Sequence, residues 1–418
     1  MFEATLRYNS NSDKHPVATS GKSLDSLLIP GKMLAANSKA LPTNLRNWYD
    51  SYNLEYYIQP TLFDFRVGDN FRDSSGSVRT WHWDYATEVD RLLEELLAKQ
   101  DNVDATDLSA NQLRQLTISS VEFQESFVPN QLEAETGKYE SISDPEKYSP
   151  KAVIPWFQQI RDGRDLKVNE DILDVATDVS ELPLKPCLFL TKEALHSDSL
   201  PDQLTELLTS RDIDQCFLWI ENLDKQETGE PDYERIASLV ANLDGAGISP
   251  HFYYGDYFAT LLSHLGLTGT TYGTMYGEEA SERRERRTGD GVAHRYYVDA
   301  VKDFLKIPAT VDLQGTVGAD MCSCEVCSRQ FGTWADLADR YQDDDENIQA
   351  LLKKHHIQVR WKQIQQVESE SLSETLDRLD ADYREYITPF SQSNQISNAK
   401  TLDYLPRWKN ALESVSGS

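Results

Sequence analysis

The chain has little cysteine and no long apolar run. Five of its 418 residues are cysteines, namely Cys187, Cys216, Cys322, Cys324 and Cys327. An odd number, with three cysteines crowded into one short segment, is not the pattern of a disulfide-stabilised secreted domain. No apolar run approaches the roughly 18 residues of a membrane-spanning helix, and the first residues, MFEATLRYNS, lack the features of a signal peptide. We therefore expect a soluble cytoplasmic protein.

Positive charge is also scarce. The sequence has 41 Lys and Arg against 69 Asp and Glu, a formal net charge of −28. This balance excludes nucleic-acid binding through bulk positive charge, although a local basic patch can still contact phosphates. Such an acidic surface is typical of a halophilic protein, because concentrated salt screens its self-repulsion. A binding surface for a basic partner is the alternative.

The order of apolar segments predicts an α/β fold. Short β-rich runs occur at 26–30, 56–65, 118–125, 187–191, 216–222, 251–255, 269–275 and 309–315. Helical periodicity separates several of them, at 85–99, 201–208, 233–243 and 257–265. Strands alternating with helices indicate parallel βα units, and eight such units predict a (β/α)8 TIM barrel. A doubly wound open sheet is the alternative, although no G-x-G-x-x-G motif follows the first run.

The character of the chain changes after residue 315. We predict a catalytic barrel over 1–315, a zinc-binding helical subdomain over 316–366, and C-terminal helices with a frayed tail over 367–418. Helical patterns at 333–341, 348–367 and 372–386 support this division.

A metal site is the most specific prediction. Cys322, Cys324 and Cys327 are spaced so that three thiols can face one point, and a histidine 28 residues after Cys327 can complete a tetrahedron. His355 and His356 are both candidates, of which we favour His355. Three thiolates and one imidazole suit Zn²⁺, and four protein ligands leave no position for water, so the zinc is expected to be structural.

The C-x-C-x2-C motif followed by a histidine, placed behind a predicted barrel, resembles the tRNA-guanine transglycosylase family and its DNA-guanine transglycosylase relatives. Three further segments are similar to family motifs: 61–64 (TLFD) to T-D-S-G-G, 123–126 (FQES) to F-D-E-C, and 251–255 (HFYYG) to H-Y-L-M-G. The resemblance implies an enzyme that replaces guanine by a 7-deazaguanine base in DNA or tRNA. The short C-terminal region slightly favours DNA, and by analogy the protein forms a homodimer.

Two family features are missing. The S-G-G that should follow Asp64 is absent, and the family motif F-D-C-V-x-P-T-R, which carries its nucleophile, has no counterpart with an Asp in 269–278. A non-catalytic subunit that binds nucleic acid or an active partner is therefore the alternative.

The chemistry itself calls for carboxylates at the ends of barrel strands. Displacing a base from a sugar passes through an oxocarbenium-like state, in which one carboxylate attacks and another handles protons. Asp64 matches the family position of the acid–base partner. We choose Asp256 as the nucleophile because it ends a predicted strand, and keep Glu278 and Asp312 in reserve.

The remaining candidates concern binding. Flat rings and hydrogen-bonding edges suited to a guanine-like base are offered by Phe123, Gln124, Glu125, Glu221, Asn222, Tyr254 and Tyr257. Phosphates could be contacted by Arg283, Arg284, Arg286, Arg287, Lys353 and Lys354. Pairing with neighbouring glutamates in a helix is the alternative for the arginines.

Overall fold

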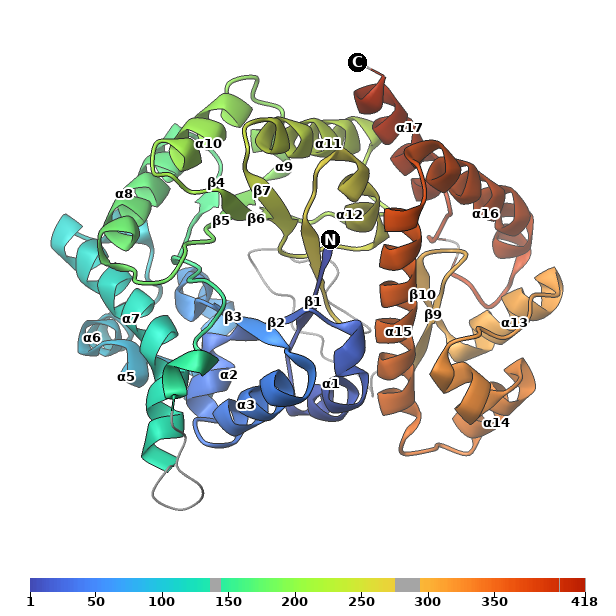
Figure 1. Cartoon of the computed structure of the whole chain (residues 1–418), viewed down its shortest axis with the longest axis horizontal. Coiled ribbons are helices and arrows are strands. Elements are labelled where there is room, and N and C mark those ends of the chain that lie inside the picture. Colours follow the sequence, from blue (N-terminus) through green and yellow to red (C-terminus); the bar gives the residue numbers. More distant parts are fainter. Residues whose placement is uncertain (136–143, 275–293, 398, 418) are drawn as a thin grey trace.

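The computed structural model describes residues 1–135, 144–274, 294–397 and 399–417, and its centre is a parallel barrel-like sheet (Figure 1). The eight strands are β1 (Glu3–Arg7), β2 (Ser26–Pro30), β3 (Glu55–Gln59), β4 (Gln159–Ile160), β5 (Cys187–Leu190), β6 (Gln215–Ile220), β7 (Ser249–Phe252) and β8 (Gly269–Tyr272). Their hydrogen-bonded order is β3-β2-β1-β8-β7-β6-β5-β4, and every pair is parallel. The predicted (β/α)8 fold class is confirmed.

The segment before β4 joins the two ends of this ladder. Lys151 N donates a hydrogen bond to the Tyr56 carbonyl of β3 at 2.9 Å, and Val153 forms a parallel bridge with Leu184, just before β5. The strands thus follow one another around a ring in chain order. A doubly wound sheet, in which the strand order reverses part-way, does not have this arrangement.

Helices surround the ring. Those that belong to the βα units are α1 (Lys14–Ser20), α2 (Gly31–Ala36), α3 (Ala40–Tyr52), α4 (Gly68–Phe71), α5 (Thr80–Val89), α6 (Arg91–Lys99), α7 (Ala110–Glu135), α8 (Gly163–Val179), α9 (Lys192–Leu195), α10 (Leu200–Thr209), α11 (Glu230–Gly245) and α12 (Tyr257–Leu261). No helix in the described ranges is long and apolar enough to cross a membrane.

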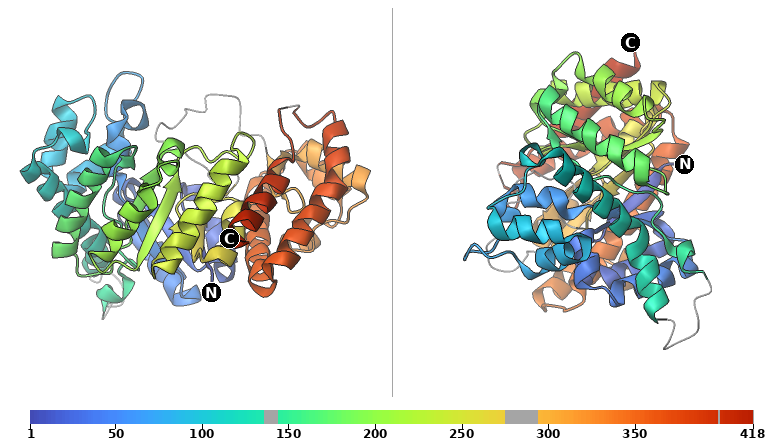
Figure 2. Two further views of the ribbon diagram at one scale, coloured as in Figure 1. Left: turned by 90° about the horizontal axis from the view of Figure 1, so that it is seen from above. Right: turned by 90° about the vertical axis from the view of Figure 1, so that its left-hand side faces the viewer.

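The rest of the chain packs against one side of the barrel (Figures 1 and 2). It consists of the antiparallel hairpin β9 (Arg295–Val298) and β10 (Asp303–Lys306), then α13 (Ile307–Val317), α14 (Trp334–Gln342), α15 (Ile348–Ser369), α16 (Leu372–Gln392) and α17 (Tyr404–Ser416). Helix α15 runs along the barrel, in contact with α1 and α12. The predicted domain boundaries within this arrangement stay predictions.

Two predicted strands are helices. Residues 118–125 lie inside α7, where the buried Leu113, Leu116, Ser120 and Val121 recur at helical spacing. Residues 309–315 lie in α13, which starts beside Pro308 and ends at Gly318, a glycine in the left-handed conformation (φ 76°) that commonly terminates helices. Asp312 is therefore on a helix, and the β-branched residues of both runs were a misleading signal.

Strands β1 and β4, which were not predicted, complete the set of eight, and both carry polar residues. β1 holds Glu3 and Arg7, and β4 holds Gln159; all three side chains are paired inside the barrel. Buried parallel strands are usually recognised as continuous apolar runs, and these polar residues interrupt the runs in β1 and β4.

Three smaller expectations also need correction. The run at 56–65 is a strand only to Gln59, after which 61–66 form a 3-10 turn. The helix at 85–99 is interrupted at Asp90, whose side chain caps α6 by accepting from Leu92 N at 2.6 Å. The last residues, ESVSGS, were predicted as a frayed tail, but the chain is helical up to Ser416 in α17, which packs against α11 and α16.

Candidate functional site

The four predicted metal ligands come together. One donor atom from each of Cys322, Cys324, Cys327 and His355 lies within 4.8 Å of all the others. The Nδ1 atom of His355 is 3.3 Å from the sulfur of Cys324 and 3.3 Å from that of Cys327. The edge of a zinc–thiolate tetrahedron is about 3.8 Å, given metal–sulfur bonds of about 2.3 Å. The cluster therefore fits one metal ion with tetrahedral coordination.

Second contacts orient the ligands. His355 Nε2 donates to the Tyr297 carbonyl on β9 at 2.9 Å, which directs Nδ1 toward the thiols. The ring of Tyr296 stacks on that of His355 with centroids 4.1 Å apart, and its hydroxyl lies 3.2 Å from the Cys327 sulfur. Burial and the neighbouring thiols raise the pKa of Tyr296, so this hydroxyl stays protonated and donates to Cys327.

Without a metal, the His355 imidazole and the three thiols still affect one another's ionisation. Burial opposes a charge on His355, but its hydrogen bonds to Cys322 and Cys324 outweigh burial and raise its pKa to about 10. Hydrogen bonds from the other two thiols lower the pKa of Cys322. Metal binding would displace the imidazole proton, since only the unprotonated nitrogen can be a ligand.

His356 faces a different environment. Its ring meets Phe304 at 4.6 Å and Tyr297 at 4.7 Å between centroids, and it is fully buried. Adjacent residues on a helix point about 100° apart. The structure thus resolves the choice between the two histidines in favour of His355.

Asp64 lies at the carboxyl-terminal rim of the barrel. The neighbouring Phe63 enters the barrel interior, where it stacks on Phe157 at 5.2 Å. The Asp64 carboxylate is 1% exposed; its Oδ2 atom is 2.5 Å from Lys32 Nζ and 3.4 Å from His82 Nε2. A carboxylate, an ammonium and an imidazole therefore form one buried group at the place predicted for acid–base chemistry.

Lys32 and His82 were not among the predicted site residues. Lys32 follows the end of β2, so the rule that barrel sites lie at the carboxyl ends of strands could have found it. His82 comes from α5, and no sequence signal linked it to Asp64.

A second polar group, the mouth cluster, consists of Arg7, Gln59, Gln159, Glu221 and Tyr254. Arg7 donates to Gln59 Oε1 at 2.8 Å and lies over the Tyr254 ring, 3.6 Å from its centroid. Gln159 Nε2 donates to Glu221 Oε2 at 2.5 Å. Five strand ends thus contribute hydrogen-bonding groups to the barrel mouth, of which Glu221 and Tyr254 were predicted.

Asp256 has a structural contact. It does not end a strand, because β7 stops at Phe252; its Oδ1 instead accepts from Phe258 N at 2.9 Å as the N-cap of α12. Its role as nucleophile stays a prediction.

The segment 123–125 is placed away from strand ends. Gln124 is fully buried in α7 and exchanges hydrogen bonds with the Ile154 backbone, at 2.8 and 3.0 Å. Phe123 packs against Phe127 with centroids 4.7 Å apart, and Glu125 accepts from Ser180 Oγ at 2.7 Å. The prediction that these three residues belong to a strand is wrong, and these contacts do not support base recognition.

The other predicted binding residues differ in accessibility. Asn222 is exposed in a left-handed conformation (φ 51°) after β6, whereas Tyr257 is fully buried and its hydroxyl accepts from Arg378 at 3.1 Å. Lys353 is buried in an ion pair with Asp13 at 2.7 Å, which does not support phosphate contact, while Lys354 is half-buried. Outside the described residues lie Glu278, Arg283, Arg284, Arg286 and Arg287.

Comparison with known proteins gives no family. No family model and no curated protein matches the chain. Among solved structures, a putative fructose-1,6-biphosphate aldolase from Coccidioides immitis is 7% identical over 92% of each chain, with a TM-score of 0.33. An intracellular xylanase from Thermoanaerobacterium saccharolyticum is 10% identical over 67% of this chain and 86% of its own, with a TM-score of 0.34. At these scores neither likeness informs the function.

Proposed function

We propose that the protein is a base-exchange glycosyltransferase that replaces guanine by a 7-deazaguanine base in nucleic acid, DNA in preference to tRNA. The observation that carries the proposal is the cluster of Cys322, Cys324, Cys327 and His355, assembled beside a (β/α)8 barrel as in the family that the sequence resembles. The proposal takes the metal to be Zn²⁺, because three thiolates and one imidazole are a typical structural zinc site.

In this proposal Asp64 belongs to the group that acts as the general acid and base. Its ion pair with Lys32, 2.5 Å long, favours the carboxylate form, and the imidazole of His82 provides a second proton-carrying group 3.4 Å away. The departing guanine takes up a proton from this group, and the incoming base returns one when its ring nitrogen bonds to the sugar.

The mouth cluster would hold the base. Tyr254 supplies a flat ring, and Glu221 and Gln159 supply an acceptor and a donor for the edge of a guanine-like base. Asp256 remains the proposed nucleophile, and Glu221 is a second candidate because it directly follows β6. A target base in a duplex would have to be flipped out to reach these groups.

The test is incorporation of labelled guanine into DNA and tRNA by the purified protein. We expect incorporation into DNA, and a loss of at least about 100-fold in rate for Asp64→Asn, the usual scale for an acid–base group. Asp380→Asn is the matched control, since Asp380 pairs with Arg384 on α16 away from the barrel mouth. Full activity of Asp64→Asn would contradict the assignment.

A non-catalytic subunit is the second candidate. It is favoured by the engagement of both predicted catalytic carboxylates in structural contacts, Asp64 with Lys32 and Asp256 with the α12 backbone. Binding of nucleic acid without any guanine incorporation would support this candidate over the enzyme.

A further inference from the structure

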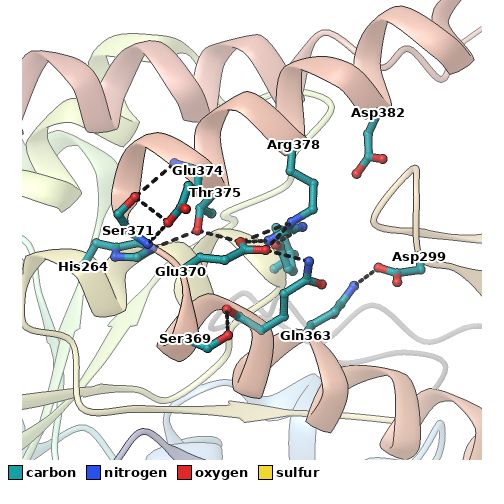
Figure 3. A network of polar contacts seen from close by, with 12 residues as sticks. His264, Asp299, Gln363, Ser369, Glu370, Ser371, Glu374, Thr375, Arg378 and Asp382 are labelled. Carbon is teal, nitrogen blue, oxygen red and sulfur yellow. Dashed lines mark hydrogen bonds and ion pairs between the residues drawn. The ribbon is translucent and has the colours of Figure 1, made fainter.

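A cavity of about 340 Å³ lies next to the metal cluster, and the proposed base exchange makes no use of it. It is enclosed by the β9–β10 hairpin, the loop of Cys322, and helices α13, α15 and α16. Several of its polar residues appear in Figure 3, where Asp299 and Asp382 approach from separate elements.

Two carboxylates in this cavity share one lysine. Lys302, 2% exposed, lies 3.0 Å from Asp299 Oδ1 and 3.2 Å from Asp382 Oδ2. One positive charge thus faces two negative charges. The nearby Arg378 does not correct the imbalance, because its own partner is Glu370 at 2.9 Å.

The rim adds no net charge. Asp320 and Lys362 both line the opening, and their charges cancel. The three acids and three bases that line the cavity cancel formally, but Glu370, just outside the lining, neutralises Arg378 and leaves one excess negative charge beside Asp299 and Asp382. This excess favours a cationic ligand.

The walls suit a flat cation that also carries an acceptor. Tyr297, Trp334 and Tyr386 line the cavity, and aromatic rings are side chains that attract guanidinium groups. Gln314 is only 4% exposed and lines the same cavity; its Oε1 accepts from the Tyr386 hydroxyl at 3.0 Å. The Gln314 amide nitrogen has no hydrogen-bond partner within the described part of the chain, so it is available to an acceptor on a ligand.

We propose that this cavity binds the guanidinium group of an arginine side chain from a basic protein segment. A guanidinium has donors on several edges, so it can bridge Asp299 and Asp382, whereas an ammonium is a compact point charge. The peptide carbonyl of the same arginine would accept from Gln314. The net charge of −28 favours the approach of a basic partner over long range.

Calorimetric titration of the full chain tests the proposal with three peptides, Gly-Arg-Gly, Gly-Lys-Gly and Gly-citrulline-Gly, each acetylated and amidated. We expect one site for the arginine peptide, at least tenfold weaker binding of the lysine peptide, and no binding of the neutral citrulline peptide. Equal binding of the citrulline peptide, or no binding of the arginine peptide, would overturn the proposal. Agmatine carries a guanidinium group without a peptide backbone. If agmatine bound but the arginine peptide did not, the proposal that the ligand is a protein segment would be overturned.

Variants locate the site. Asp382→Asn should weaken the arginine peptide at least tenfold, whereas Asp380→Asn on the same helix should not change its affinity. Because Lys302 loses one of its two partners in Asp382→Asn, a thermal melt checks folding, and Gln314→Ala provides a second variant with its carboxylates intact. We expect a several-fold loss for Gln314→Ala. Unchanged affinity in both folded variants would contradict the site.

Discussion

At the scale of single residues, His355 and His356 show how neighbouring side chains of one type take different roles. His355 points its Nδ1 atom at the thiols, whereas His356 packs among the rings of Tyr297 and Phe304. The sequence spacing predicted a histidine ligand but left two candidates. The three-dimensional direction of each ring was needed to decide.

We predict that His355→Ala lowers the metal content of the purified protein from about one ion per chain to nearly none. His356→Ala should retain about one ion while losing stability, because it leaves a cavity among aromatic rings. Elemental analysis measures both. Cys187→Ala, inside the barrel, is the control for general loss of a thiol. Metal loss in His356→Ala alone would contradict the ligand assignment.

Glu3 is a partly buried acid at the start of β1, with its side chain 15% exposed. Burial alone would raise its pKa, but Lys185, His251 and Lys151 outweigh burial and lower it to about 2. A carboxyl whose pKa is lowered by folding stabilises the fold above its unfolded pKa, and this contribution is lost as the pH falls toward 2. Burial in turn lowers the pKa of Lys185 to about 8.

We therefore predict that Glu3→Gln reduces the free energy of unfolding at pH 7 by about 3 kcal/mol. The difference from the unsubstituted protein should shrink below about pH 4.5 and vanish near pH 2. Urea denaturation at several pH values measures it, with the exposed Glu88→Gln as control. A difference that is independent of pH would show that the ion pairs are not its source.

At the scale of elements, several predictions made from the spacing of apolar residues were close to the structure. Strands β2, β5 and β6 and helices α10, α11 and α15 lie close to their expected positions. The failures have two causes, paired polar groups in a strand and β-branched residues in helices. Glu3 and Arg7 concealed β1, and β-branched residues in α7 resembled a strand although Gln124 bonds to the backbone as part of a helix.

The residues of the candidate site also divide into those that the sequence predicted and those that it did not. Local spacing sufficed for the metal ligands, because the three cysteines lie on one short segment. The partners of Asp64 come from α2 and α5, and such long-range pairs leave no periodic trace in a single sequence.

The metal cluster also joins two elements, since His355 on α15 donates to the Tyr297 carbonyl on β9. We predict that removing the metal with a chelator speeds hydrogen exchange in the middle of α15, where His355 lies, and in β9, whose Tyr297 carbonyl accepts from His355. Exchange in β2 and β5 should not change, because these strands lie in the barrel. Faster exchange throughout the barrel would contradict a local role for the cluster.

At the scale of the whole molecule, the charge of −28 dominates. Self-repulsion among exposed carboxylates destabilises a compact acidic chain, and salt screens it. We predict that the thermal midpoint rises by several degrees between about 0.1 M and about 2 M KCl. Calorimetric scans measure this, with sucrose as a non-ionic control for solvent exclusion. A midpoint that falls with salt would mean that attractive ion pairs outweigh the repulsion.

The metal centre is the feature on which the account most depends, because it links the barrel to the proposed chemistry. X-ray absorption spectroscopy of the purified protein tests it most directly. We predict zinc with three sulfur ligands at about 2.3 Å and one nitrogen ligand at about 2.0–2.1 Å. Absence of a bound metal, or a zinc ion coordinated mainly by oxygen, would contradict the account.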